Sequence, residues 1–306
     1  MDSVAFIFSG QGAQKPGMGQ SLYNTSSAVK DMFDAAETIR PGTLRQCFEG
    51  PAELLRQTDI TQPCLYLTDL AAALALRERG ILPAAAAGFS LGEIPALAFC
   101  GAFSLAEGFR LACERGRLMR ESADRYSASM AAVIKLDNET VESLCKAYPH
   151  IYPVNYNAPG QLVVSGYADE LKAFDADVRE AGGRLLPLAV GGPFHSPLMD
   201  SASHAFAQVL EDCEIRLPDI PVYANANAHP YVGDPKVLMS RQINSPVRWE
   251  ETIRRMAQNG IRIFIETGVG NVLCKLVQKI LPDALAYTVF DSESLDKVCR
   301  ELGVSS

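Results

Sequence analysis

The sequence predicts an α/β protein whose main domain has a mostly parallel sheet and carries a smaller inserted sheet. Two observations lead to this prediction. Apolar runs of strand length alternate with stretches of helical periodicity over most of the chain. Between residues 127 and 191 the order changes to β-α-β-β-α-β, which is typical of a ferredoxin-like fold. We therefore expect residues 1–126 and 192–306 to form the main domain and residues 127–191 to form the inserted one.

The first segment contains two predicted strands, each with helical sequence after it. Residues 3–10 read SVAFIFSG and residues 81–90 read ILPAAAAGFS, and both are short apolar runs that end in small residues. Residues 61–80 and 91–103 carry apolar side chains at helical spacing. Strands that lead into helices favour a parallel sheet.

The inserted segment contains four predicted strands and two predicted helices. The strands cover residues 129–136, the two halves of 151–167 around a Pro159-Gly160 turn, and 184–190. The helices cover residues 139–148 and 168–183. After the insert, predicted helices at 195–215 and 249–260 alternate with predicted strands at 221–227 and 261–267. The main sheet is thus expected to resume.

Composition limits the partners. The chain has 28 basic and 36 acidic residues, a net charge of −8, which argues against nucleic acid and anionic membranes. No apolar stretch reaches the roughly 20 residues that span a bilayer, and the start lacks the basic region of a signal peptide. We therefore expect a cytoplasmic protein that binds neither nucleic acid nor membrane.

The eight cysteines are scattered, with no CxxC pair and no histidine spaced to complete a metal site. This spacing favours buried, reduced thiols over metal ligands. We expect no metal and no cofactor.

Ser90 lies in a G-x-S-x-G motif, Gly88 to Gly92, between a predicted strand and a predicted helix. This is the context of a nucleophile elbow, in which flanking glycines relieve crowding at a strained turn. The Leu91 N–H at the start of the helix is then placed to stabilise an oxyanion. The alternative is an ordinary serine that caps a helix.

A nucleophilic serine needs a base, and the chain has four histidines. His195 follows a Gly-Gly-Pro loop before a helix, a position typical of catalytic groups. His204 lies inside a helical pattern, and His150 and His229 lie in turn-like segments. His195 is therefore the candidate base.

The loop FSGQGAQKPGMG follows the first predicted strand and is rich in glycine. It lacks the lysine of a phosphate-binding P-loop and the spacing of a dinucleotide fingerprint. The other use of such a loop is to turn a backbone N–H toward the site. Gln11 is the candidate for this second oxyanion donor.

These motifs stand among several others spread along the chain. They are GQGAQKPGMG, GFSLGE, ERGRLM, PVNYNAPGQLVVSG, PFHSPLM, RQINSPVRWEETI and ETGVGNVL. In this order they resemble the malonyl-CoA:acyl-carrier-protein transacylase family and are similar to acyltransferase domains of polyketide synthases. The resemblance covers nearly the whole chain. It implies an α/β-hydrolase-like large domain with a mostly parallel sheet and an inserted ferredoxin-like small domain.

The resemblance also implies roles for individual residues. Ser90 would be the nucleophile and His195 the general base, with the backbone carbonyl of Gln242 accepting the other ring N–H of His195. The N–H groups of Leu91 and Gln11 would form the oxyanion hole. The implied reaction loads the malonyl group of malonyl-CoA onto Ser90 and then transfers it to the phosphopantetheine thiol of acyl carrier protein, for fatty-acid synthesis.

Substrate choice is implied at two further positions. Arg115 would bind the malonyl carboxylate, because a guanidinium matches a carboxylate bidentately. Spacing alone makes Arg115 a solvated helix arginine, one of four in FRLACERGRLMRE. Phe194 resembles the family variant that accepts malonyl rather than a branched acyl group.

The chain departs from the family pattern at two positions beside Ser90. Phe89 stands where the family usually has histidine, which removes a polar group near the acyl pocket. Pro95 falls about five residues into the helix after Ser90, where its missing N–H predicts a kink or an irregular first turn.

Other interpretations stay open from the sequence. A serine hydrolase or thioesterase would use the same elbow with water, a binding module would need no catalysis, and a free-standing acyltransferase would serve a polyketide synthase. An acidic carrier needs a local basic patch, and we expect it among Arg179, Arg184, Lys275 and Lys279. We expect a monomer.

Overall fold

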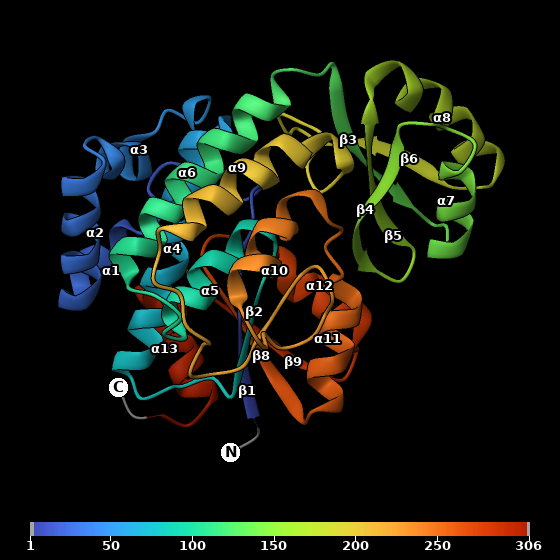
Figure 1. The fold of residues 1–306 in the computed structure, drawn as a ribbon. Helices are drawn as coiled ribbons and strands as arrows, with labels where there is room; N and C mark the ends of the chain where they lie inside the picture. The colour runs from blue at the N-terminus through green and yellow to red at the C-terminus, as the bar shows by residue number, and fades with distance from the viewer. Residues whose placement is uncertain (1–2, 305–306) are drawn as a thin grey trace.

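The computed structural model describes residues 3–304, and its larger sheet has five parallel strands in the order β7-β2-β1-β8-β9 (Figure 1). The strands are β1 (Ser3–Phe8), β2 (Ala85–Gly88), β7 (Val222–Tyr223), β8 (Ile261–Thr267) and β9 (Leu285–Val289). The predicted mostly parallel sheet is confirmed. The chain passes from central β1 to β2 and β7 on one side and to β8 and β9 on the other, so the strand order reverses between β1 and β8. Ligand crevices in parallel sheets form at the carboxyl ends of such strands.

Alternation along β1 divides the core between the two faces of the sheet. Phe6 and Phe8 belong to one buried cluster, and Ala5 and Ile7 belong to the other. All four side chains are fully buried. Successive side chains of a strand point to opposite faces, so a strand that is apolar throughout must be covered on both sides.

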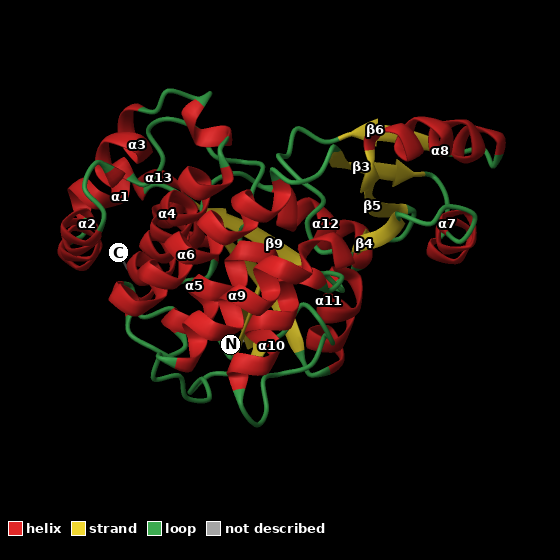
Figure 2. Cartoon of the chain, turned by 45° about the horizontal axis from the view of Figure 1, so that its top comes forward, coloured by secondary structure: helices red, strands yellow, loops and turns green. Residues whose placement is uncertain are grey.

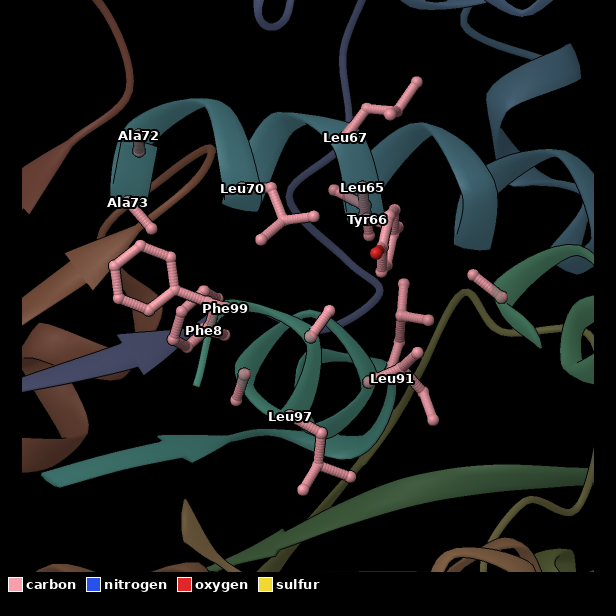
Figure 3. Packing of buried hydrophobic residues seen from close by; sticks show 14 of the residues in the cluster. Phe8, Leu65, Tyr66, Leu67, Leu70, Ala72, Ala73, Leu91, Leu97 and Phe99 are labelled. Atoms are coloured by element: carbon pink, nitrogen blue, oxygen red, sulfur yellow. The ribbon is translucent and has the colours of Figure 1, made fainter. Parts of the chain in front are cut away.

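Helices provide that cover (Figure 2). The helices outside the inserted segment are α1 (Gln20–Thr25), α2 (Ser27–Ile39), α3 (Thr43–Glu49), α4 (Thr58–Glu78), α5 (Glu93–Phe99), α6 (Leu105–Ala123), α9 (Asp200–Glu211), α10 (Pro235–Arg241), α11 (Trp249–Gln258), α12 (Val272–Ile280) and α13 (Ser292–Glu301). Figure 3 shows Leu70 of α4 and Leu97 of α5 in the same cluster as Phe8 and Phe99. On the opposite face, Ile253 of α11 and Leu276 of α12 pack with Ile7.

The smaller sheet is antiparallel and lies to one side of the larger one (Figure 1). Its strands, in the order β4-β5-β3-β6, are β3 (Ala128–Ile134), β4 (Ile151–Ala158), β5 (Gln161–Tyr167) and β6 (Arg184–Pro187). Helices α7 (Asn138–Cys145) and α8 (Ala168–Glu180) complete the predicted β-α-β-β-α-β order. These elements fall within residues 127–191, and the domain boundaries themselves stay a prediction.

The structure also tests the predicted irregular turn after Ser90. Residues Ser90–Gly92 form a 3-10 turn before α5 begins at Glu93. Pro95 is therefore the third residue of α5, where its missing N–H has no partner to lose. The predicted irregular first turn is present, and it allows proline in this helix.

Some elements are absent from the sequence interpretation. It includes no strand at β9 and no helix at α13, and β7 has only two residues instead of the predicted seven. β9 lies at the edge of the sheet, so most of its side chains are only half-buried. An edge strand needs only a short apolar run, and the sequence of β9 therefore gives a weak strand signal.

Within residues 3–304, no helix combines the length and the apolar character needed to cross a bilayer. The same part of the chain holds no group of three or more His, Cys, Asp or Glu residues arranged to bind a metal ion.

Candidate active site

Ser90 lies at a strained turn at the carboxyl end of β2. Its φ is 54°, in the left-handed region that residues with a side chain rarely occupy. A Cβ on Gly88 would lie 1.9 Å from the carbonyl carbon of Gly92, and a Cβ on Gly92 would lie 2.2 Å from the Phe8 carbonyl oxygen. Both positions therefore require glycine. The G-x-S-x-G motif forms the predicted elbow, with the Ser90 hydroxyl held out of the sheet.

His195 contacts the Ser90 hydroxyl. Ser90 Oγ lies 2.8 Å from His195 Nε2, and His195 Nδ1 lies 3.0 Å from the carbonyl oxygen of Gln242. A carbonyl oxygen only accepts, so Nδ1 carries the proton and Nε2 of the neutral ring is free to accept from serine. The arrangement can remove a proton from Ser90, with the Gln242 carbonyl holding the ring in the required tautomer.

Burial keeps the His195 ring neutral. The residue is 3% exposed, and desolvation, followed by the positive charge of Arg115, lowers its pKa to about 4. The hydrogen bond to Gln242 opposes this shift only in part. His195 also has a positive φ of 62°, and its N–H donates to the Ile243 carbonyl oxygen at 3.2 Å. Its loop is thus tied to the segment that orients the ring.

Arg115 is fully buried beside the same hydroxyl. Its Nη2 donates to Ser90 Oγ at 3.3 Å and to Gln242 Oε1 at 2.7 Å, and its Nη1 donates to Gln62 Oε1 at 2.8 Å. Burial lowers the pKa of Arg115 to about 10, so it remains charged near neutral pH. None of the ion pairs among residues 3–304 includes Arg115, and its Nε has no hydrogen-bond partner there. A buried cation that forms no direct ion pair fits an anionic ligand.

The periodicity of α6 explains why this arginine alone points inward. The buried residues of the helix recur in pairs every three or four positions, at 108 and 109, 111 and 112, 115 and 116, 118 and 119, and 122 and 123. Arg110, Arg117 and Arg120 lie off this stripe and form exposed ion pairs with nearby acids. The expectation from spacing alone, that Arg115 is a solvated helix arginine, is therefore wrong, because the apolar stripe includes its position and excludes the other three arginines.

Asn225, which the sequence interpretation missed, holds the elbow from the side. Its Oδ1 accepts the Ser90 N–H at 2.8 Å, and its Nδ2 donates to the Gly88 carbonyl oxygen at 2.6 Å. Asn225 follows β7, which is the neighbour of β2 in the parallel sheet. The carboxyl ends of parallel neighbours meet at one edge, but Asn225 lies inside the predicted strand 221–227, so no signal in the sequence set it apart.

A buried carboxyl group supports Asn225 in turn. Glu93 Oε2 accepts the Asn225 N–H at 2.7 Å, and Glu93 Oε1 accepts the Tyr231 hydroxyl. Burial raises the pKa of Glu93 to about 7, although its hydrogen bonds and the charge of Arg115 oppose the shift. The side chain of Gln242 adds a further link, because its Nε2 donates to the Ser90 carbonyl oxygen. Sequence reasoning assigns only the backbone of Gln242.

The two expected oxyanion donors, Leu91 and Gln11, lie on segments next to the Ser90 turn. Leu91 follows Ser90 at the start of a 3-10 turn, and the first N–H groups of such a turn lack internal acceptors. Gln11 follows β1 in the loop next to β2 and lines the same cleft as Ser90. A Cβ on Gly10 would lie 2.7 Å from the Phe89 carbonyl oxygen, so glycine allows this loop to approach the elbow.

The two phenylalanines occupy different walls. Phe194 is 6% exposed and lines the cleft beside His195. Phe89 also lines the cleft, and its ring packs edge-on against Trp249, with centroids 5.5 Å apart at 65°. Phe89 is therefore part of the apolar cluster on one face of the large sheet.

The remaining candidates lie elsewhere. His150 contacts Glu170 on the small domain at 2.7 Å, while His204 and His229 are exposed. Of the four basic residues named for carrier docking, Arg179 pairs with Asp175 at 2.9 Å, and Arg184, Lys275 and Lys279 are exposed.

A cleft of about 270 Å³ joins these groups and lies between the two sheets. The larger domain contributes Ser90, His195 and Arg115, and the smaller sheet contributes residues of β3, β4 and β5. Apart from a few polar groups the lining is apolar. A cleft of this kind suits a ligand with one charged end and a long neutral body.

The chain is similar in sequence to proteins of known family. A family model described as an acyl transferase domain matches residues 5–294. The chain belongs to this acyl transferase family. A malonyl CoA-acyl carrier protein transacylase of Bacillus subtilis is 36% identical over 99% of this chain and 98% of its own.

Solved acyl transferases agree with the fold. The malonyl CoA-acyl carrier protein transacylase of Clostridium perfringens superimposes with a TM-score of 0.95 at 31% identity, covering 98% of this chain and 97% of that one. A malonyl-transacylase in complex with its type II polyketide synthase acyl-carrier protein gives a TM-score of 0.93 at 33% identity, covering 98% and 99%. The predicted α/β fold with a second, small sheet is therefore confirmed.

Proposed function

We propose that this acyl transferase moves the malonyl group from malonyl-CoA to the phosphopantetheine thiol of acyl carrier protein, in fatty-acid synthesis. One observation carries the choice of acyl group. Arg115 is a fully buried guanidinium that forms no direct ion pair among the described residues, and it lies 3.3 Å from the Ser90 hydroxyl. An acyl group bound to Ser90 with a free carboxylate would form that direct ion pair. The similarity to the malonyl CoA-acyl carrier protein transacylases of Bacillus subtilis and Clostridium perfringens supports the same assignment.

In the first half-reaction Ser90 Oγ attacks the thioester carbonyl carbon while its proton passes to His195 Nε2. The neutral ring and the 2.8 Å contact favour this transfer. The tetrahedral intermediate then expels the thiolate of coenzyme A, which takes the proton from His195. The product is a malonyl ester on Ser90 and free coenzyme A.

The negative oxygen of the tetrahedral intermediate would accept from the backbone N–H groups of Leu91 and Gln11. Both N–H groups belong to loops that close glycine contacts hold in place. In the second half-reaction the phosphopantetheine thiol gives its proton to His195 and attacks the ester. Collapse of that intermediate returns the proton to Ser90 and leaves the malonyl group on the carrier.

Water would compete at the same ester in a hydrolase, which is an alternative that the sequence leaves open. The transacylase names of relatives that match nearly the whole chain do not favour it. The eight cysteines are free, which supports action in a reducing compartment, and we propose the cytoplasm. We also retain the proposal of a monomer.

Intact-protein mass spectrometry tests this function. We expect malonyl-CoA to add one malonyl group to the wild type and none to Ser90→Ala, and acyl carrier protein to remove the group again. Arg115→Met should reduce the rate of malonyl loading about 10- to 100-fold, the range for a hydrogen bond to a charged group, without reducing acetyl loading. Arg117→Met is the matched control, because Arg117 lies on the outer face of the same helix.

An absent adduct would contradict the proposal. So would equal loading of malonyl and acetyl groups that ignores Arg115.

A further inference from the structure

Two asparagines in the cleft have side-chain oxygens without hydrogen-bond partners among the described residues. Asn155 and Asn157 of β4 are 7% and 8% exposed, and both line the cleft that holds Ser90. Within residues 3–304 neither side-chain oxygen has a hydrogen-bond partner. A buried polar atom without a partner is destabilising by about 1–3 kcal/mol, so such atoms in a cleft point to a ligand that satisfies them.

The backbone of β4 fixes the position of this pair. The Val247 N–H donates to the Val154 carbonyl oxygen at 2.7 Å, and the Tyr156 N–H donates to the Val247 carbonyl oxygen at 2.9 Å. Val247 follows the segment whose Gln242 carbonyl orients His195. Asn155 and Asn157 are two residues apart along the strand, so they share the face toward the cleft. The two carboxamides are thus held along one wall by the segment that also serves the catalytic base.

The charges of the cleft restrict the ligand at this wall. Among its lining residues Arg115 is the only cation and Glu266 is the only acid. Arg115 lies at the Ser90 end, and the neighbouring strands of the small sheet contribute the apolar residues Met130, Ala132 and Val163 and one neutral polar residue, Gln161. A phosphate would find no cation on this wall. A neutral group that both donates and accepts hydrogen bonds fits a carboxamide best.

We infer that Asn155 and Asn157 bind the amide groups of the pantetheine arm, an inference that rests on the proposed function. The arm carries two neutral amides on a flexible chain that ends in the thiol, and both the coenzyme A thioester and the carrier thiol present it. One carboxamide can donate to an amide carbonyl or accept from an amide N–H. The pair therefore serves both half-reactions at one site, while the phosphates of the arm stay outside the cleft.

The experiment compares three malonyl thioesters that differ only in the arm. They are the S-ethyl thioester, which has no amide, the N-acetylcysteamine thioester, which has one, and the pantetheine thioester, which has two. Loading of Ser90 is followed by mass spectrometry in the wild type, Asn155→Leu and Asn157→Leu. Asn24→Leu, an exposed asparagine on α1, is the control.

In the wild type each added amide should raise kcat/KM about 3- to 10-fold, the range for one neutral hydrogen bond. Each variant should lose the gain from one amide and load the S-ethyl thioester as fast as the wild type. Leucine is close in size to asparagine and no protein hydrogen bond of the side-chain oxygen is lost, so both variants should melt at or above the wild-type temperature. If a leucine variant fails to fold, the alanine variant at the same position is measured instead.

Three outcomes would overturn the inference: a wild type that gains nothing from the amides, variants that keep the whole gain, or an equal loss on all three thioesters. The last would assign the asparagines a purely structural role. A wild type that forms no malonyl ester with any thioester would instead contradict the proposed function.

Discussion

Asn225 accepts the Ser90 N–H at 2.8 Å through Oδ1, while its Nδ2 donates to the Gly88 carbonyl oxygen at 2.6 Å. One side chain thus bridges the two sides of the strained turn. Ser90 keeps its φ of 54° only while the surroundings impose it, and this bridge is one of the constraints.

Asn225→Ala should therefore reduce the rate of Ser90 acylation by about 10- to 100-fold, because displacement of a reacting atom by an ångström has effects of this size. We expect the KM for malonyl-CoA to change little, since Asn225 is not among the residues that line the cleft. Rapid-mixing mass spectrometry gives the acylation rate. Asn227→Ala, an exposed asparagine two residues on, should behave as the wild type, and a normal rate in Asn225→Ala would contradict the bridging role.

The pH dependence of loading should report His195. Its pKa is lowered to about 4 by burial and then by Arg115, and only the neutral ring accepts the serine proton. Acetyl loading in the wild type should therefore be flat near neutral pH and fall as the pH drops through about 4. Arg115→Met removes the neighbouring charge, so the fall should begin at a higher pH. An unshifted profile in this variant would contradict the electrostatic coupling, and Arg117→Met serves as the control.

Glu93 should make the folded state less stable as the pH rises, whereas the rate of loading rises with pH. Its pKa is about 7 in the folded chain, against 4.5 for an unperturbed glutamate, so the folded state binds more protons between these values. This contribution is complete below pH 4.5 and is lost as the pH rises through 7. Glu93→Gln cannot ionise, so its melting temperature relative to the wild type should increase between about pH 5 and 8. A constant difference across this range would show that Glu93 keeps the same protonation state.

Phe89→His would restore the residue that the family usually carries. The Phe89 ring packs against Trp249 in an apolar cluster, so the imidazole should lower the free energy of unfolding by about 1–3 kcal/mol. Malonyl loading should persist, because Arg115, the proposed ligand of the carboxylate, lies on α6, whereas Phe89 lies in the turn after β2. Urea denaturation measures the first effect and mass spectrometry the second. A gain in stability would mean that Phe89 is not adapted to its aromatic neighbour.

Features that depend on neighbouring residues in the sequence could be predicted, whereas features that depend on contacts between distant segments could not. The elbow at Ser90 and most strands of both sheets could be predicted, because glycine spacing and apolar periodicity are local properties. Asn225 could not, since its role depends on the pairing of β7 with β2, and β7 has only two residues. Arg115 is intermediate. The apolar stripe of α6 marks it as buried, but only the tertiary fold places it beside Ser90.

The position of Arg115 has a consequence for how the acyl donor is chosen. Its charge lies against the serine hydroxyl and weakens the basicity of His195. A donor that brings a carboxylate cancels this charge and strengthens the base at the moment of attack. A donor without one leaves the base weakened, even if it binds equally well. The malonyl group is therefore an activator of its own transfer, and discrimination against acetyl groups should be larger in kcat than in KM.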